Sequence, residues 1–287
     1  MNRPYPDHSF IDYKGIKVPA FLYGTAWKED ETEVLTLLAA NSGFVGIDTA
    51  NQRRHYHEAG VGKAIKQLLF EGLLQRKDLF LQTKFTFANS QDDRLPYDPD
   101  ADFTSQVQQS FESSLQHLGT AYLDSYMLHG PASRRGLTEA DIEVWRAMEQ
   151  LQRSGVVRLL GVSNVDDEQL QALIAMAEIK PAFVQNRCFA KTRWDFTIRE
   201  ICAANDIIYQ GFSLLTANAV ELRSPELARI AKRIDCTIAQ IVFRFALQAG
   251  MIVLTGTCNN VHMLEDLACT GIELSDADMT IIENIAC

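Results

Sequence analysis

The sequence has no glycine-rich turn of the kind that holds a dinucleotide at the start of a helix. Its first apolar run continues as FLYGTAWKED (residues 21–30) and does not contain GxGxxG. A dinucleotide, if one binds, is therefore not held by a Rossmann turn. The chain also has no CxxC pair, and its six cysteines show no metal-like spacing to histidine (Cys188, Cys202, Cys236, Cys258, Cys269 and Cys287). We expect free thiols and no bound metal.

Long hydrophobic runs and an excess of positive charge are missing too. No segment approaches about 18 uninterrupted apolar residues, and the N-terminal MNRPYPDHSF has no apolar signal-peptide region. The 27 Lys and Arg are outnumbered by 37 Asp and Glu, for a net charge of -10. Because nucleic-acid and anionic-membrane surfaces need clustered Lys and Arg, we expect neither partner. A cytoplasmic protein that acts on small molecules is the remaining expectation.

The composition, with 47% hydrophobic and 22% charged residues, is typical of a globular protein with a sizeable core. Apolar, β-rich runs occur at 21–26, 43–50, 79–85, 123–129, 156–164, 182–187, 207–213 and 251–257. Stretches with helical spacing lie between them, at about 29–41, 58–74, 102–118, 138–154, 166–177, 195–205 and 224–249. The last stretch is expected to hold two helices, broken near Asp235.

This alternation predicts a closed parallel (β/α)8 TIM barrel rather than an open sheet. Residues 9–20, with a turn at Lys14-Gly15, predict an N-terminal β-hairpin that caps the barrel. The polar, Pro-containing stretch 89–102 is expected to be a barrel-top loop. No linker is apparent, so we expect residues 1–287 to form a single domain with a short C-terminal tail.

Polar residues that close the apolar runs are the first candidates for chemistry, because active sites of such barrels lie at the C-terminal ends of the strands. They are Asp48, Lys84, His129, Ser163, Asn164, Gln185, Asn186, Ser213 and Thr257. A buried lysine needs a partner, and Asp48 on the preceding run can pair with Lys84. Tyr56 stands near them, before a helix. We expect the Lys84 ammonium to lower the pKa of Tyr56, which then acts as a general acid.

Together these segments resemble the aldo-keto reductase family. The matching pieces are GIDTA (46–50) with Tyr56, LQTK (81–84), LDSYMLHGP (123–131), GVSN (161–164) and Gln185-Asn186. They span nearly the whole predicted barrel in the family's order. The resemblance implies NAD(P)H-dependent reduction of aldehydes or ketones, with a catalytic tetrad of Asp48, Tyr56, Lys84 and His129. Tyr56 protonates the carbonyl oxygen and His129 orients it.

The resemblance also implies a cofactor site. Ser163, Asn164 and Gln185 would hold the nicotinamide carboxamide, and Phe212 would stack on the ring. The other implied cofactor contacts are Thr25, Asp48, Ser213, Leu215, Thr257, His262, Glu265 and Asp266. The implied substrate pocket comprises Trp27, Tyr56, His129 and Gly130.

Several positions depart from the family pattern. The segment between Asp48 and Tyr56 is longer than usual, and Gly130 follows His129 where many members have Trp. Gly256 and His262 stand where the family has the Lys and Arg that grip the 2′-phosphate. We therefore expect NADPH as cofactor with NADH possible. Without the family's long C-terminal tail, an open, permissive site is expected.

Alternative functions remain open on the same barrel. Lys84 could be the Schiff-base nucleophile of an aldolase-type enzyme, although pairing with Asp48 would keep its amine protonated. The chain could also be a non-catalytic, cofactor-binding redox-sensing or regulatory subunit, as the resemblance allows. Asp48 and Lys84 could form a structural ion pair only, and Ser163-Asn164 a helix cap. A small-molecule carbonyl is the expected partner, and a monomer or weak homo-oligomer the expected state.

Overall fold

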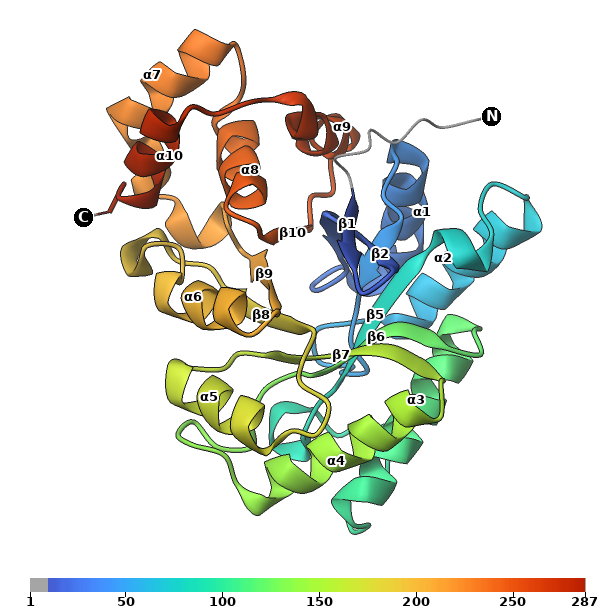
Figure 1. The fold of residues 1–287 in the computed structure, drawn as a ribbon. Helices are drawn as coiled ribbons and strands as arrows, with labels where there is room; N and C mark the ends of the chain where they lie inside the picture. Colours follow the sequence, from blue (N-terminus) through green and yellow to red (C-terminus); the bar gives the residue numbers. More distant parts are fainter. Residues whose placement is uncertain (1–9, 287) are drawn as a thin grey trace.

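The computed structural model describes residues 10–286, and their strands close into one parallel barrel. The strands follow the order β10-β3-β4-β5-β6-β7-β8-β9 around the barrel, with helices outside them (Figure 1). Their bounds are β3 Phe21–Gly24, β4 Gly46–Asp48, β5 Phe80–Phe85, β6 Leu123–Leu128, β7 Val157–Ser163, β8 Phe183–Arg187, β9 Ile208–Phe212 and β10 Ile252–Thr255. Each of the eight predicted strands is present, so the predicted (β/α)8 fold is confirmed.

Helices cover the outside of the barrel. They are α1 Thr32–Ser42, α2 Glu58–Phe70, α3 Phe103–Leu118, α4 Glu139–Arg153, α5 Asp167–Met176, α6 Phe196–Ala204, α7 Pro225–Ile234, α8 Ile238–Gln248, α9 Asn260–Ala268 and α10 Asp276–Glu283. The predicted break near Asp235 is real, because this residue ends α7 in the left-handed region at φ 60°. Short 3-10 turns are η2 Glu29–Glu31, η3 Arg76–Asp78, η4 Ala88–Ser90, η5 Ala190–Thr192, η6 Thr216–Asn218, η7 Glu221–Arg223 and η8 Cys269–Gly271.

Local sequence signals explain where several helices begin. The Thr138 hydroxyl accepts a hydrogen bond from the backbone N–H of Asp141, whose carboxylate accepts in return from the N–H of Thr138. Ser224 caps α7 and is followed by Pro225 at the first helical position. These caps satisfy N–H groups that have no partner inside the helix.

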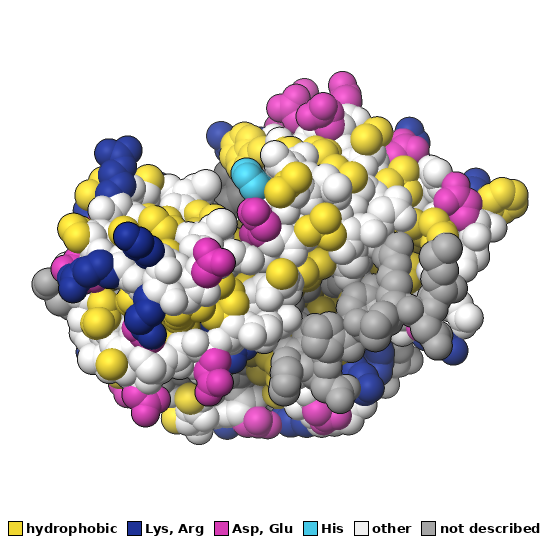
Figure 2. Space-filling model, turned by 90° about the horizontal axis from the view of Figure 1, so that it is seen from above, with side chains coloured by type: hydrophobic (Ala, Val, Ile, Leu, Met, Phe, Trp, Pro, Cys, Tyr) yellow, Lys and Arg dark blue, Asp and Glu magenta, His cyan; other side chains and the backbone are white. Residues whose placement is uncertain are grey.

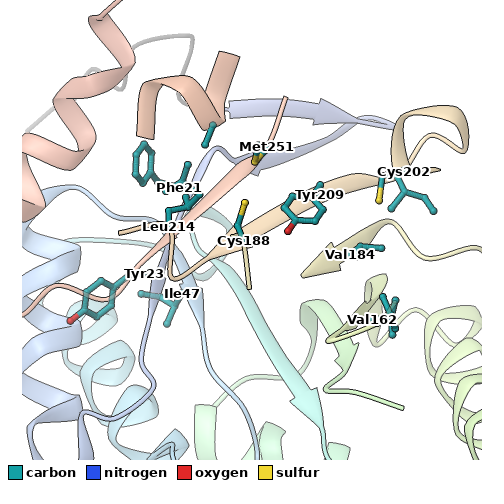
Figure 3. Packing of buried hydrophobic residues seen from close by; sticks show 14 of the residues in the cluster. Phe21, Tyr23, Ile47, Val162, Val184, Cys188, Cys202, Tyr209, Leu214 and Met251 are labelled. Atoms are coloured by element: carbon teal, nitrogen blue, oxygen red, sulfur yellow. The ribbon is translucent and has the colours of Figure 1, made fainter. Parts of the chain in front are cut away.

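The main core lies between the strands and the helices. Alternate residues of each strand point outward, and Figure 3 shows part of this layer, with Phe21, Tyr23, Ile47, Val162 and Val184 among the labelled side chains. Five cysteines in the described part of the chain are free, as expected, and Cys287 lies outside it.

A second core fills the end of the barrel where the strands begin, and the N-terminal hairpin closes it. The hairpin pairs β1 Phe10–Tyr13 with β2 Ile16–Pro19; Ser9, the first residue of the predicted hairpin, lies outside the described residues. Tyr13 and Val18 pack with inward side chains of the strands, and the Tyr13 ring centroid is 6.1 Å from that of Phe183. The predicted cap is thus a plug at the N-terminal end, which leaves the opposite end for chemistry.

The opposite end carries the longer loops. Residues 89–102 lie between β5 and α3, with their first two residues in η4, as predicted for a barrel-top loop. Figure 2 shows one face of the molecule, on which several Asp and Glu lie together at the top and several Lys and Arg lie together at the left. Among residues 10–286, no helix is long and apolar enough to cross a membrane.

Candidate active site

A cavity of about 1040 Å³ opens at the C-terminal ends of the strands. Its wall includes eleven of the predicted site residues, which come from six strands or the loops that follow them. They are Trp27, Asp48, Tyr56, His129, Gly130, Ser163, Asn164, Gln185, Asn186, Phe212 and Ser213. The strand-end positions predicted from the sequence therefore converge on one place, as parallel strands of a barrel require.

A buried ion pair lies beneath the cavity. The Lys84 ammonium is 2.7 Å from each carboxylate oxygen of Asp48 and 2.9 Å from the backbone oxygen of Thr49. Burial lowers the pKa of Lys84, and the Asp48 charge opposes that shift. All three N–H donors of the ammonium are used, and Lys84 itself is not part of the cavity wall. This geometry disfavours Lys84 as a nucleophile.

The long segment after Asp48 folds into a compact turn that delivers Tyr56. The backbone N–H of Tyr56 donates to Gln52 O at 3.0 Å. The Tyr56 ring centroid is 5.4 Å from the Lys84 ammonium and 5.8 Å from the His129 ring centroid. The expected lowering of the Tyr56 pKa is wrong for this structure, because burial, followed by the Asp48 carboxylate, raises it. Tyr56 is thus a protonated phenol at neutral pH, as a proton donor must be.

His129 is held as a neutral ring. Its Nδ1 lies 2.7 Å from the hydroxyl of Thr86, which leaves Nε2 for a group in the cavity. Burial, with smaller contributions from Lys84 and His55, lowers the pKa of His129 to about 3. The ring can therefore hydrogen-bond to a carbonyl oxygen without adding a charge.

The far wall of the cavity offers acceptors that fit a carboxamide. The Asn164 side-chain amide donates to His129 O at 2.8 Å and to Ser163 Oγ at 3.0 Å. The Gln185 amide donates to Asp48 Oδ1 at 3.1 Å and to Gln210 Oε1 at 2.9 Å. Within residues 10–286, Asn164 Oδ1 and Gln185 Oε1 accept no hydrogen bond, so the wall has two free amide oxygens, and a carboxamide has two N–H donors.

Backbone conformation at the cavity is unusual. Trp27, Asn164 and Ser213 have positive φ angles of 61°, 57° and 58° without being glycine. Such conformations cost free energy and gather at functional sites. The Trp27 side chain is also 70% exposed, with its ring centroid 4.0 Å from that of His55. These features are consistent with a cavity wall shaped for a ligand.

Some predicted cofactor residues lie away from the cavity. Thr25, Leu215, Thr257, His262 and Glu265 are not in its wall, and their roles stay predictions. The Thr25 hydroxyl donates to the backbone oxygen of Asp48 at 3.0 Å. Asp266 is buried and accepts from the Thr255 hydroxyl at 2.8 Å, a bond that joins α9 to β10. Its predicted cofactor contact also stays a prediction.

Sequence reasoning missed several residues at the site. Gln82 and Gln210 lie inside the barrel, and Thr86 contacts His129. For Gln82 and Thr86 a signal was present in the sequence, since Gln82, Lys84 and Thr86 alternate along β5 and its end. Lys28 could not be recognised from the sequence, because its contacts are distant in the chain. Its ammonium donates to Gly256 O, 228 residues away, and to Cys258 Sγ at 3.2 Å.

Comparison with known proteins agrees with this geometry. The model of the Aldo/keto reductase family matches residues 22–286. The chain belongs to the aldo/keto reductase family. This family member is 31% identical to the uncharacterized oxidoreductase YtbE of Bacillus subtilis, with 94% of this chain and 90% of the relative covered. It is 32% identical to the NADPH-dependent codeinone reductase 1-2 of Papaver somniferum, with 94% and 87% covered.

Solved structures show the same fold. An aldo/keto reductase from Brucella melitensis superposes with a TM-score of 0.82 at 27% identity, and 99% of each chain is covered. Among curated relatives, glyoxal reductase of Bacillus subtilis is 28% identical over 94% of this chain and 90% of that protein. The chain is therefore an oxidoreductase of this family.

Proposed function

We propose that the protein reduces aldehyde or ketone carbonyls to alcohols with a nicotinamide cofactor. The observation that carries the proposal is the meeting of Tyr56 and His129 in one cavity wall, 5.8 Å apart between ring centroids and directly above the Lys84–Asp48 pair. Among the described residues of the wall Tyr56 is the only tyrosine, and the second histidine, His55, packs against the Trp27 ring. A carbonyl oxygen between them receives two hydrogen bonds.

Each side chain of the site has a separate role in the proposed reaction. The bound nicotinamide supplies the hydride to the carbonyl carbon. Tyr56 gives its phenolic proton to the oxygen, and the nearby Lys84 ammonium stabilises the phenolate that remains. His129 holds the oxygen through Nε2, while Thr86 fixes the other ring nitrogen. Asp48 keeps the Lys84 ammonium in place and protonated.

The cofactor is proposed to be NADPH, with NADH as a second possibility. Asn164, Gln185 and Ser163 hold the carboxamide, and Phe212 provides the stacking surface, with the Arg187 guanidinium 5.6 Å from its ring centroid. Thr25, Ser213, Leu215, Thr257, His262 and Glu265 are proposed contacts for the rest of the dinucleotide. Gly256 stands where the family has a lysine that contacts the 2′-phosphate. The Lys28 ammonium lies beside Gly256 and is proposed to supply the positive charge in its place.

The substrate is proposed to be a small carbonyl compound bound in an open pocket. Trp27, at the rim, offers an exposed ring, and Gly130 leaves one wall without a side chain. The relatives named codeinone reductase and glyoxal reductase differ widely in the size of the compound they are named for. We therefore expect broad acceptance of aldehydes and ketones, which an initial-rate panel with NADPH and NADH measures.

The direct test is the Tyr56→Phe variant, which keeps the ring and removes the acidic proton. Carbonyl-dependent loss of NADPH absorbance should fall at least about 100-fold, the usual contribution of a general acid. NADPH affinity should stay within about twofold of wild type. Tyr122→Phe is the matched control, because its ring packs on Arg76 outside the cavity, and it should be fully active. A Tyr56→Phe enzyme as active as wild type would remove Tyr56 from the mechanism.

The two alternative functions give different outcomes in the same assays. A regulatory subunit would bind NADPH tightly and turn over none of the carbonyls. An aldolase-type enzyme would form a borohydride-trapped adduct on Lys84, whose three donors are engaged in this structure. We also propose that residues 1–287 act as one domain, as a monomer or weak homo-oligomer in the cytoplasm. Light scattering after size-exclusion chromatography measures the oligomeric state.

A further inference from the structure

Three glutamines fill the middle of the barrel below the cavity. Gln82 on β5, Gln185 on β8 and Gln210 on β9 are 0%, 3% and 0% exposed. Burying an amide costs free energy unless its donors and acceptors are satisfied. Strand interiors of such barrels are usually filled by branched apolar residues, so three adjacent amides require a reason.

The amides form a closed ring with Asp48. Gln82 Nε2 donates to Asp48 Oδ1 at 2.7 Å and to Gln210 Oε1 at 2.8 Å. Gln185 Nε2 makes the equivalent pair of bonds, at 3.1 Å to Asp48 Oδ1 and 2.9 Å to Gln210 Oε1. Gln210 Nε2 returns a bond to Gln82 Oε1 at 3.1 Å. The side-chain amides of Gln82 and Gln185 thus each link Asp48 Oδ1 to Gln210 Oε1.

The carboxylate dictates which way each amide points. The oxygen and nitrogen of a glutamine side chain are often interchangeable in a structure, but ionised Asp48 can only accept. Gln82 and Gln185 must therefore present nitrogen to Asp48, and their remaining N–H groups must find an acceptor. Gln210 Oε1 is that acceptor for both. The orientation of the whole ring follows from the charge of Asp48.

One side-chain atom of the ring, Gln185 Oε1, has no hydrogen-bond partner among the described residues and lies at the cavity. Gln185 is the ring member, besides Asp48, that forms part of the cavity wall. With both its N–H donors engaged below, Gln185 has Oε1 free as an acceptor. The ring turns a flexible side chain into a fixed acceptor for the N–H of a carboxamide.

We propose that Gln82 and Gln210 are positioning residues for the nicotinamide. They touch neither cofactor nor substrate, and act by locking the Gln185 amide with its oxygen toward the cavity. Gln82 also donates a hydrogen bond to Asp48, the partner of Lys84. This inference rests on the proposed function, since it requires a nicotinamide in the cavity.

The test is Gln210→Met, which keeps the length of the side chain and removes the shared acceptor. Binding to the cofactor-free protein is measured by quenching of tryptophan fluorescence with NADPH, NADH and 2′,5′-ADP, which lacks the nicotinamide. Affinity for NADPH and NADH should fall about tenfold, as expected for loss of one well-placed hydrogen bond. Affinity for 2′,5′-ADP should not change. Ser125→Ala, which removes a buried polar group on β6 that is outside the ring, should change neither affinity.

Each other outcome overturns the inference in a recognisable way. Equal NADPH affinity in Gln210→Met and wild type would show that the ring does not position Gln185. An equal loss of affinity for NADPH and for 2′,5′-ADP would indicate that Gln210 has a structural role only. If wild type binds no nicotinamide nucleotide, the proposed function itself fails.

A second variant keeps the test valid if Gln210→Met does not fold. Gln210→Leu removes the same acceptor with a shorter apolar side chain. The affinity for NADPH should again fall about tenfold, and the affinity for 2′,5′-ADP should stay unchanged. An unchanged NADPH affinity in a folded Gln210→Leu protein would contradict the positioning role.

Discussion

Burial changes the proton affinity of the two polar rings in the cavity wall. It raises the pKa of Tyr56 and lowers that of His129 to about 3, so both rings are neutral at pH 7. In the unfolded chain His129 titrates near 6.5, so below that pH the unfolded state binds a proton that the folded state does not. The stability that depends on a neutral His129 is complete above pH 6.5 and is lost as the pH falls toward 3.

This gives a testable prediction for stability. Because His129 lines the cavity and is partly exposed, we expect a loss of about 1–2 kcal/mol in unfolding free energy between pH 7.5 and 5 from this residue. Urea titrations at the two pH values measure it, and His129→Gln should show a correspondingly smaller loss. An identical pH dependence in His129→Gln would mean that the ring does not resist protonation.

The segment that carries Tyr56 is held in place by the first residue of α2, Glu58. Glu58, two residues after Tyr56, is 4% exposed and accepts hydrogen bonds from Thr83 on β5 and, at 3.0 Å, from His117 Nδ1 on α3. This bond raises the pKa of His117, so its contribution to stability is present below about pH 6.5 and is lost as the pH rises through the folded value. One carboxylate therefore links three elements.

Removing that carboxylate should loosen the link. Glu58→Ala leaves the Thr83 hydroxyl without its acceptor, and we expect the unfolding free energy to fall by about 2–4 kcal/mol. The pKa of His117, followed by NMR, should return toward 6.5. Glu112→Ala, at an exposed position of α3, is the control and should change neither quantity. A raised His117 pKa that survives in Glu58→Ala would mean that another group holds the imidazole.

Across the whole molecule, stability and chemistry occupy opposite ends of the barrel. The hairpin plugs one end through Tyr13, which packs on Phe183 and donates to Asp206 O at 2.9 Å. We expect Tyr13→Ala to cost about 3–5 kcal/mol of unfolding free energy while KM for NADPH and carbonyl stays unchanged. Chemical denaturation and initial rates measure both, with exposed Lys17→Ala as control. A large rise in KM would show that the two ends are coupled.

The sequence by itself determined the fold and most of the catalytic group. Eight apolar runs separated by helical stretches allow few topologies, and the strands of a parallel barrel all end at one rim. Asp48, Lys84 and His129 could therefore be predicted as neighbours from their places at strand ends. Tyr56 could be named, but the conformation of its loop could not be predicted, because turn geometry depends on contacts such as Tyr56 N–H to Gln52 O.

Only the tertiary structure decided what depends on contact between distant segments. The direction of the Tyr56 pKa shift follows from burial, which no local pattern reports. Lys28 meets Gly256, and Gln82 meets Gln210, because closing the barrel brings together residues more than a hundred positions apart. Local sequence sets which residues reach the rim, and packing across the barrel sets which atoms remain free to act.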